Sequence, residues 1–357
     1  MKYILLNLKI EKSFEEKIYM SIKKNHSLKE LNTFGIDVKA NYLAEIFSVN
    51  ELKDVLKDSE FNNLPKLILG GGSNILFTKD FEGLILKISI PGINILDENK
   101  ENVIVESGAG VVWNDLVNYC VEKKFGGIEN LVLIPGTVGA APIQNIGAYG
   151  QELKDTFLEL SGVFLDSVDE KSFTNSECKF SYRNSIFKNE LKDKFIVTSI
   201  KLRLKKNPEI NSSYKDILDE LRKSNISNPS IKDISNIVAS IRRRKLPDPV
   251  EFGNAGSFFK NPVISLTQFE ELNKKYPGLK SFPVDDRYVK ISAAWLIEKC
   301  GWKGKQSGNV GTYHNQPLVL INYGNATGSE VFEFAMEIKE SVQTKFGVTL
   351  QNEVNII

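Results

Sequence analysis

Cysteine and histidine are scarce in this chain of 357 residues. The three cysteines, Cys120, Cys178 and Cys300, are far apart and odd in number, which argues against a disulfide framework, a redox C-x-x-C pair or a zinc site. The two histidines, His26 and His314, are too few for a histidine-based metal cluster. A Ser-His-Asp triad would have to recruit His314, and no G-x-S-x-G elbow is present. We therefore expect neither a metal site nor an activated-serine hydrolase, and redox chemistry would require an organic cofactor.

The chain also lacks a strong net charge and a long apolar run. It has 46 Lys and Arg residues against 45 Asp and Glu residues, a formal net charge of +1 that favours neither nucleic acid nor a membrane surface as a partner. No apolar run approaches the ~20 residues that a spanning helix needs. The start, "MKYILLNLKIEKS", is interrupted by Asn7 and Lys9, and no small-residue cleavage site follows it. We therefore expect a cytoplasmic protein.

Helical and strand patterns alternate along the chain, whose length predicts two or three domains. Residues 48–61 have helical spacing with Ser48 as the expected N-cap, and 111–127 form an amphipathic helix that we expect Gly126 and Gly127 to close. Residues 157–206 have a mostly β pattern. This mixture of helices and strands predicts an α+β or α/β architecture.

A third amphipathic helix is predicted at 231–245, "IKDISNIVASIRRRK". Its terminal cations suit a helix C-terminus, and we expect Arg242 to Arg244 to be a solvated helix end. The following "LPDP" breaks the helix and is the predicted domain boundary.

The first of two glycine loops is "LGGGSN", Leu69 to Asn74. A Walker loop would need Gly-Lys-Ser/Thr, and a Rossmann fingerprint would need a following helix, but "ILF" continues as a strand. Two interpretations remain open. The loop is either a nest of backbone N–H groups aimed at a phosphate or a plain tight turn.

The second loop, "IPGTVGAAPIQNIGAYGQE" (134–152), has hardly any large polar side chain. Such a segment is a poor solvated loop and suits a backbone pressed against a flat ligand. Two glycine loops, each preceded by a strand, could grip the two phosphates of a dinucleotide. The pattern does not name the cofactor.

A third stretch, "FGNAGSFFKNP" (252–262), places Ser257 between small residues and the pair Phe258 and Phe259. The small residues let backbones approach closely, and the two rings must be packed away. The Ser257 hydroxyl therefore either forms a hydrogen bond within a turn or takes part in the chemistry of a site.

Several motifs occur in the order typical of one family: "NTFGI", "LGGGSNILF", "GIENLVLIPGTVGAAPIQNIGAYG", "CKFSYRNSIFK", "KLPDP", "GNAGSFFKNP", "AAWLIEKCGWKG" and a late "NEV". From about Asn25 to the C-terminus the chain resembles the UDP-N-acetylenolpyruvoylglucosamine reductase family, flavoenzymes of peptidoglycan precursor synthesis. The resemblance implies an α+β fold: an FAD-binding domain of the vanillyl-alcohol-oxidase/PCMH type, made of two α/β subdomains, and a smaller α/β substrate-binding domain. The expected boundaries are an N-terminal extension at 1–24, FAD-binding subdomains at 25–95 and 96–246, and a C-terminal substrate-binding domain at 247–357.

Residues 1–24 match nothing in the family. Residues 1–19 are expected to be dispensable, with Met20 as a natural start. The alternative is that "KYILLNLKI" forms an added strand.

The resemblance also implies the reaction. NADPH would reduce a non-covalently bound FAD, and UDP-N-acetylglucosamine enolpyruvate would then take a hydride at its methylene carbon and a proton at the neighbouring carbon. Such chemistry needs an acid, positive charge for the substrate carboxylate and enol oxygen, and a dry pocket. The FAD pyrophosphate would lie on the first glycine loop and the ring along the second. The residues implied in cofactor binding are Gly70, Gly71, Gly72, Ser73, Asn74, Pro135, Gly136, Thr137, Gly139, Ala140, Ile146, Gly147 and Ala148.

By the same resemblance Ser257 is the proton donor, Arg183 steadies the developing enolate, and Glu353 works beside that arginine. The structural alternatives are that Ser257 only caps a turn and that Arg183 only forms a salt bridge at the end of a strand, which would add little stability. The implied substrate contacts are Tyr214, Lys245, Asn261 and Gln316. The last two could equally be turn residues.

The expected partners are the sugar nucleotide and NADPH, with no nucleic acid or membrane, and the expected state is a monomer. Two other functions compete: an oxidase or dehydrogenase of the same flavin fold, and a sugar-nucleotide-binding module without catalysis. Many such oxidases tether flavin through histidine or cysteine, and neither residue occurs in the two glycine loops. The colour of the purified protein, and its bleaching by NADPH, would separate the three.

Overall fold

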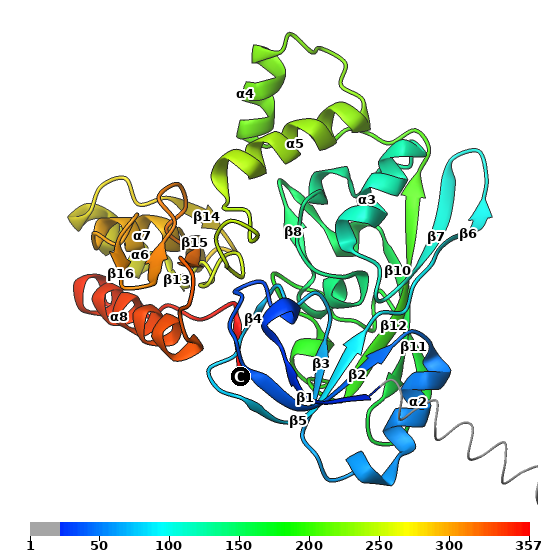
Figure 1. Ribbon diagram of the computed structural model, residues 1–357. Coiled ribbons are helices and arrows are strands. Elements are labelled where there is room, and N and C mark those ends of the chain that lie inside the picture. The colour runs from blue at the N-terminus through cyan, green and yellow to red at the C-terminus, as the bar shows by residue number, and fades with distance from the viewer. Residues whose placement is uncertain (1–21) are drawn as a thin grey trace, which may run out of the picture. The chain divides into compact units, whose positions relative to one another are not determined.

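The computed structural model describes residues 22–357, and these divide into two compact units (Figure 1). Unit 1 consists of residues 22–26, 40–71 and 82–242, and unit 2 of residues 27–39, 72–81 and 243–357. The proposed dispensability of residues 1–19 lies outside the described residues. The four predicted domain ranges stay predictions.

A four-stranded sheet in the order β1-β2-β5-β3 starts the fold. Its strands are β1 (Ile22–Ser27), β2 (Lys39–Ile46), β5 (Phe81–Ile88) and β3 (Lys66–Leu69). Helix α2 (Val49–Lys57) follows β2 and buries one apolar face. The Ser48 hydroxyl accepts the amide of Glu51 at 3.1 Å, so the N-cap expected from the sequence is confirmed.

A five-stranded antiparallel sheet forms the larger part of unit 1, in the order β11-β10-β12-β7-β6. Its strands are β6 (Ile93–Glu98), β7 (Asn102–Gly108), β10 (Phe157–Phe164), β11 (Glu170–Thr174) and β12 (Phe195–Lys205). The β pattern at 157–206 is confirmed for β10, β11 and β12, whereas residues 175–194 form turns and the 3₁₀ helix η6 (Ile186–Lys188). β6 and β7 form a hairpin at one edge of the sheet (Figure 1).

Helix α3 (Trp113–Glu122) ends earlier than the sequence pattern indicated. Lys124 adopts a left-handed φ of +61°, and Phe125 donates its amide to the Cys120 carbonyl at 2.8 Å, which closes the helix. Gly126 instead exchanges two backbone hydrogen bonds with Lys205, at 2.8 and 3.0 Å. The prediction that the glycines close this helix is therefore wrong, because a lysine takes the left-handed position.

Helices α4 (Lys215–Lys223) and α5 (Ile231–Lys245) follow β12 and are joined by a loop at residues 224–230 (Figure 1). The predicted helix at 231–245 is confirmed to the residue, with its apolar stripe buried. The second glycine loop contains the 3₁₀ helix η4 (Val138–Gln144) and the two-residue strands β8 (Gly147–Ala148) and β9 (Gln151–Glu152).

Unit 2 is built from short strands and three helices. Its sheets have the orders β13-β15-β14, β16-β17-β18 and β19-β4, with the last pair parallel. The strands are β4 (Ile75–Leu76), β13 (Val263–Ser265), β14 (Ser281–Pro283), β15 (Tyr288–Ile291), β16 (Gln306–Ser307), β17 (Val310–Thr312), β18 (Leu320–Asn322) and β19 (Asn355–Ile356). The helices are α6 (Leu266–Lys275), α7 (Ala293–Lys299) and α8 (Gly328–Phe346).

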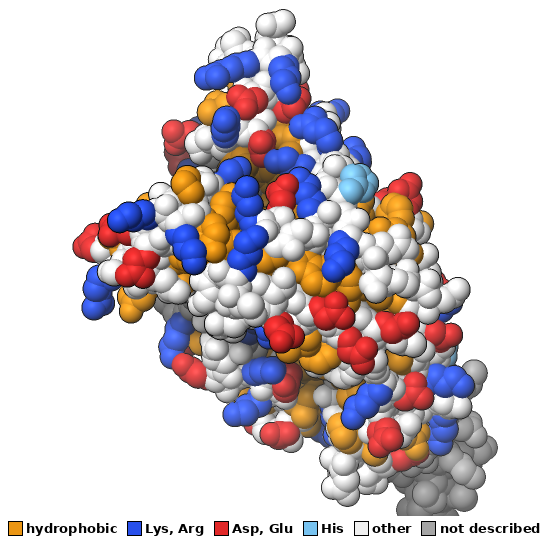
Figure 2. All heavy atoms as spheres, turned by 90° about the vertical axis from the view of Figure 1, so that its left-hand side faces the viewer, with side chains coloured by type: hydrophobic (Ala, Val, Ile, Leu, Met, Phe, Trp, Pro, Cys, Tyr) orange, Lys and Arg blue, Asp and Glu red, His pale blue; other side chains and the backbone are white. Residues whose placement is uncertain are grey.

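Acidic and basic side chains both occur across the face drawn in Figure 2, in keeping with the net charge of +1. Within residues 22–357, no helix has the length and apolar character needed to cross a bilayer. The same part of the chain has no cluster of three potential metal ligands.

Candidate active site

The two glycine loops touch each other in unit 1. A Cβ atom on Gly71 would lie 2.9 Å from the Cα of Gly136, a contact that real Cβ atoms do not make. A Cβ on Gly70 would lie 2.6 Å from Thr137 Oγ1. Lys87 Nζ donates to the Gly70 carbonyl at 2.6 Å and fixes the start of the first loop. The two loops therefore pack backbone to backbone, which only glycine allows at these positions.

Small residues line the outer edge of the second loop. Pro135 and Ala140 are exposed, Gly147 and Ala148 are half-buried, and Ile146 is buried. Ile134, Ile143, Gln144 and Tyr149 are also half-buried, so longer side chains contribute to the loop as well. The exposed positions, Pro135, Ala140 and Gly150, carry small side chains or none, which suits contact with a flat ligand.

The second half of the first loop belongs to unit 2. Gly72 has a φ of +62°, and a Cβ there would overlap the Leu31 carbonyl. Asn74 Nδ2 donates to the Glu353 carbonyl at 3.3 Å, while the Asn74 carbonyl accepts the amide of Asn355 at 3.1 Å. The loop therefore ends by holding the segment that carries Glu353.

Arg183 lies at the second loop, in unit 1. It occupies a tight turn in which the backbones of Ser181 and Asn184 exchange hydrogen bonds at 3.1 Å. Its φ is +53°, a conformation that glycine favours and other residues rarely adopt. Arg183 Nη2 donates to the Gly147 carbonyl at 2.9 Å. A strained non-glycine residue at such a position is a candidate for function.

Arg242 differs from the solvated helix end that the sequence pattern predicted. It is half-buried, its Nη2 donates to the Leu133 carbonyl at 3.2 Å, and its buried Nε has no hydrogen-bond partner. Burial lowers the pKa of its guanidinium, Tyr149 opposes this shift, and the like charge of Arg183 adds to it. In the described part of the chain no carboxylate pairs with Arg242. An uncompensated cation therefore lies at the start of the second loop.

Ser257 and Glu353 lie on adjoining backbone segments of unit 2. The Phe258 amide donates to the Leu318 carbonyl at 2.8 Å, and the Phe258 carbonyl accepts the Glu353 amide at 2.8 Å. Phe258 and Phe259 are 0% and 1% exposed, with ring centroids 5.1 Å apart. These rings anchor the segment, while Ser257 and Glu353 stay half-buried.

Thr33, from the "NTFGI" motif, joins the first glycine loop to the Ser257 loop within unit 2. Its amide donates to the Gly72 carbonyl at 3.0 Å, and its hydroxyl donates to the Asn254 carbonyl at 2.6 Å. Asn254 accepts the Gly256 amide at 3.0 Å and so shapes the turn before Ser257. No role for Thr33 was predicted from the sequence, although the "NTFGI" motif that contains it was the available signal.

The implied substrate residues fall in both units. In unit 2, Asn261 Oδ1 accepts the amide of Ala293 at 3.0 Å, and Gln316 lies in a turn with its amide bonded to the Tyr313 carbonyl at 3.2 Å. Lys245 is the last residue of α5 and is half-buried. Asn261 and Gln316 thus both have structural contacts.

In unit 1, Tyr214 directly precedes α4 and is 44% exposed. Its ring meets the ring of Tyr149 edge to face, with centroids 5.2 Å apart. It therefore lies beside the end of the second glycine loop.

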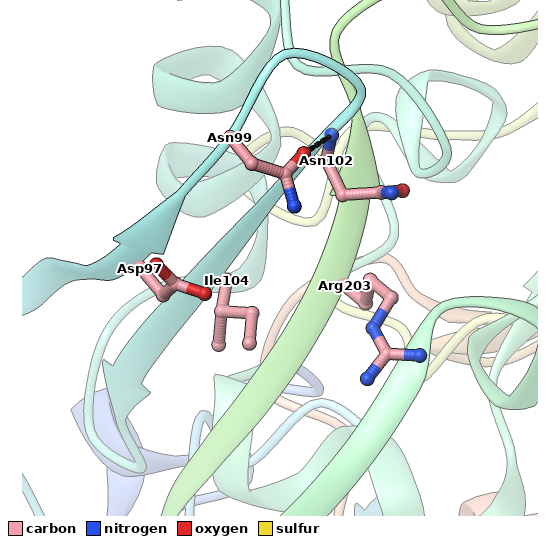
Figure 3. A pocket seen from close by; sticks show the side chains of 5 residues that line it. All are labelled: Asp97, Asn99, Asn102, Ile104 and Arg203. Carbon is pink, nitrogen blue, oxygen red and sulfur yellow. Dashed lines mark hydrogen bonds between the residues drawn. The ribbon is translucent and has the colours of Figure 1, made fainter.

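A separate hollow lies on the β6–β7–β12 part of the large sheet (Figure 3). Asp97, Asn99, Asn102, Ile104 and Arg203 line it. None of the residues singled out above is among them, so this hollow is not part of the candidate site.

None of the three cysteines is among the residues singled out for the site. Burial raises the pKa of the Cys120 and Cys178 thiols to about 12, and it also raises the pKa of Cys300. All three are free thiols. Protonated thiols are poor nucleophiles and poor metal ligands.

Two family models match the chain. One, described as an FAD binding domain, matches residues 40–166, and the other, described as the UDP-N-acetylenolpyruvoylglucosamine reductase C-terminal domain, matches residues 248–357. The expected α+β architecture with an FAD-binding domain of the vanillyl-alcohol-oxidase/PCMH type is confirmed.

Curated relatives agree with these matches. A UDP-N-acetylenolpyruvoylglucosamine reductase of Flavobacterium johnsoniae is 51% identical over 95% of this chain and 100% of its own length. Reductases of the same name from Amoebophilus asiaticus and Pseudomonas aeruginosa are 47% and 42% identical, over 95% and 94% of this chain and 100% and 99% of their own lengths. The solved reductase of Thermus caldophilus superposes with a TM-score of 0.64 at 22% identity, covering 94% of this chain and 97% of its own, and supports the fold alone. The chain thus belongs to the UDP-N-acetylenolpyruvoylglucosamine reductase family.

Proposed function

We propose that this protein reduces UDP-N-acetylglucosamine enolpyruvate to UDP-N-acetylmuramate at the expense of NADPH, in peptidoglycan precursor synthesis. Membership of the family, with relatives of that name up to 51% identical over nearly the whole chain, supports the reaction. The observation that carries it is the adjoining placement of Ser257 and Glu353, held by the Phe258 carbonyl.

The residues of the two glycine loops fit FAD. The contact of Gly71 with Gly136 brings two backbone-lined segments together in unit 1, with small residues along the outer edge of the second. Gly70 to Asn74 would hold the pyrophosphate and Pro135 to Gly150 the ring, with no covalent tether. When bound, FAD accepts a hydride from NADPH and delivers it to the substrate.

Arg242 supports an anionic ligand at the second loop. A half-buried guanidinium without a carboxylate partner is costly in the ligand-free protein. Its position at Leu133, at the start of the loop proposed to hold the flavin ring, would let it compensate negative charge on the bound cofactor or substrate.

Ser257 would deliver the proton. A serine hydroxyl is normally too weak an acid, so its oxygen must be held where developing negative charge is stabilised or where a water can relay the proton. The buried Phe258 and Phe259 hold the backbone of Ser257 in place. Glu353, on the adjoining segment, would take part in proton movement, and Arg183 would bind the substrate carboxylate and the developing enolate with its planar fork.

Tyr214, Lys245, Asn261 and Gln316 are proposed to bind the sugar nucleotide. A tyrosine ring and an ammonium group suit a nucleotide diphosphate, and amide groups suit sugar hydroxyls. We further propose a cytoplasmic monomer, which acts on small molecules and needs neither nucleic acid nor a membrane.

One anaerobic stopped-flow experiment tests the function. The yellow protein is reduced with NADPH and then mixed with the enolpyruvyl sugar nucleotide, while flavin absorbance is followed. We expect bleaching in the first step and recovery of the flavin spectrum in the second. A yellow protein that NADPH does not bleach would indicate an oxidase of the same fold, and a colourless protein would indicate a binding module.

A further inference from the structure

A fully buried asparagine joins two segments of unit 1 that are far apart in sequence. Asn130, in the 3₁₀ helix η3 (Glu129–Leu131), is 0% exposed. Its Nδ2 donates to the carbonyls of Tyr149 and Asn211, at 3.0 Å each. Both amide hydrogens are used. Because both partners are acceptors, the amide nitrogen must face them, which fixes the orientation of the side chain.

Asn211 completes the connection in the opposite direction. Its Nδ2 donates to the Gly150 carbonyl at 2.9 Å. Tyr149 and Gly150 are both left-handed, with φ of +50° and +81°, at the point where the second glycine loop ends. We call the hydrogen bonds Asn130–Tyr149, Asn130–Asn211 and Asn211–Gly150 the amide clasp.

The clasp places Tyr214 against the second glycine loop. Asn211 belongs to the segment 206–214, which runs from the end of β12 to the start of α4. The Ser213 hydroxyl donates to Asn211 Oδ1 at 3.0 Å. The edge-to-face contact between Tyr149 and Tyr214 lies directly beside these bonds.

The other end of the segment is held independently. The Lys206 amide donates to the Glu101 carbonyl at 2.8 Å, and Pro208 packs where a Cβ on Gly126 would otherwise lie. The side chain of Ile210 also packs against the hydrophobic core, so loss of the clasp would loosen residues 209–214 without detaching them and would leave the strand end in place.

Asn130 is not explained by packing alone. Its Oδ1 is buried and has no hydrogen-bond partner, which is an unfavourable arrangement. A leucine of similar size would fill the same space, but it would leave the carbonyls of Tyr149 and Asn211 without this donor. What the asparagine adds is the bridge between the two carbonyls.

We propose that Asn130 is a positioning residue that, through Asn211, docks the segment 206–214 on the second glycine loop and so holds Tyr214 in place before the sugar nucleotide arrives. This rests on the proposed substrate role of Tyr214. A docked segment loses less conformational entropy when substrate binds, so the clasp strengthens substrate binding by preorganisation. The clasp also couples the second glycine loop, proposed to hold the flavin ring, to the segment that carries Tyr214, so that the two would move together.

The test compares three variants of the flavin-loaded enzyme: Asn130→Leu, Asn211→Ala and, as a matched control, Asn207→Ala. Asn207 is an exposed asparagine of the same segment, outside the clasp. Glu-C protease reports the state of the segment through cleavage after Glu209, which is exposed and is mapped by mass spectrometry. Steady-state kinetics report KM for the sugar nucleotide and kcat separately.

Loss of one to two hydrogen bonds predicts about tenfold faster cleavage after Glu209 in Asn130→Leu and Asn211→Ala. KM for the sugar nucleotide should rise by a similar factor while kcat falls less than about threefold. Asn207→Ala should match the unmodified enzyme in both readouts.

Unchanged cleavage and unchanged KM in both clasp variants would overturn the proposal. So would a raised KM without faster cleavage, because the segment would then not have moved. If Asn130→Leu does not fold, Asn211→Ala carries the test, since Asn211 is only half-buried. A Tyr214→Ala variant separates the two claims: an unchanged KM there would remove the substrate role of Tyr214, while cleavage after Glu209 would still report the clasp.

Discussion

The backbone amide of Glu353 donates to the carbonyl of Phe258, the residue after Ser257, at 2.8 Å. An isolated bridge between Phe259 and Asn352 continues this pairing. On the other side, Ser257 pairs with Val319. The serine and the glutamate implied in catalysis therefore have their relative positions set by backbone hydrogen bonds, which do not depend on either side chain. Substitution of either side chain should leave this framework in place.

The first prediction separates the two half-reactions at Ser257. Hydride transfer from NADPH to flavin needs no proton from a serine, whereas reoxidation by the substrate does. Ser257→Ala should stay yellow and be reduced at close to the normal rate, with reoxidation slowed by about 10²–10⁴-fold, or roughly 3–5 kcal/mol of barrier. Ser257→Cys, which retains a proton, should lose less. Stopped-flow absorbance of the flavin measures both steps.

Ser307→Ala is the control, because Ser307 is an exposed serine of the same unit. Equal slowing of both steps in Ser257→Ala would point to damaged packing of Phe258 and Phe259. Normal reoxidation would remove Ser257 from the mechanism.

Local signals in the sequence predicted the elements well. The Ser48 cap and the stripe of α5 depend on residues within a few positions of one another, and both are confirmed. The end of α3 was mispredicted because Lys124 takes a left-handed conformation that glycine usually supplies. No pattern in the neighbouring residues predicts that Lys124 adopts the left-handed conformation.

The site was predictable only through the family motifs. Composition and spacing indicated a dinucleotide at two glycine loops, but the contact between Gly71 and Gly136 joins segments far apart in sequence. Arg242 donates to the Leu133 carbonyl and Asn130 to the Asn211 carbonyl, and both contacts join segments far apart in sequence. No pattern in the residues next to Arg242 or Asn130 predicts these contacts.

The second prediction concerns Gly71. A valine there would force its side chain against the backbone of Gly136, which cannot move as a flexible side chain would. We expect Gly71→Val to separate the two loops, to cost about 1–3 kcal/mol of stability, and to purify without flavin while keeping its circular dichroism. Absorbance at the flavin bands and thermal melts measure this.

Gly92→Ala serves as its control. Gly92 has a positive φ of +109° but only one atom within 4 Å of an added Cβ, at 3.8 Å. That variant should keep its flavin despite some backbone strain. Stoichiometric FAD in Gly71→Val would show that the first loop is only a turn.

A third prediction follows from the backbone of Arg183. Because its φ of +53° suits glycine, Arg183→Gly should be more stable than Arg183→Ala by about 1 kcal/mol. Both variants should lose reoxidation activity, since both lack the guanidinium proposed to stabilise the enolate. Paired thermal melts and stopped-flow traces test this. Equal stability of the two variants would show that the turn stores no strain at this residue.

The fourth prediction concerns pH and the thiols. Because burial raises the pKa of the Cys120 and Cys178 thiols to about 12, both stay protonated at pH 8. We expect iodoacetamide to label Cys300 first in the folded protein, and the other two only after unfolding. Rapid labelling of Cys120 or Cys178 at pH 8, followed by peptide mapping, would contradict their burial.

The last prediction concerns Arg242, whose replacement should affect the stability of the flavin-free protein and its affinity for ligands in different ways. Its guanidinium is half-buried, has no carboxylate partner among the described residues and retains a buried Nε without an acceptor. Replacing an unpaired buried charge with an apolar side chain of similar size is neutral or stabilising in many proteins. Arg242→Met should therefore melt at or above the temperature of the unmodified protein when both are flavin-free.

The same substitution removes the charge proposed to face the anionic ligand. Loss of a hydrogen bond to a charged group costs about 1.5–3 kcal/mol, so flavin or substrate affinity should fall by roughly 10- to 100-fold. Titration of the flavin-free protein with FAD, and of the holoenzyme with sugar nucleotide, would identify which ligand is affected. Arg243→Met, at an exposed neighbouring position, should change neither value. If Arg242→Met destabilises the flavin-free protein and leaves both affinities intact, the arginine is a structural residue that ties α5 to Leu133, and no anion lies beside it.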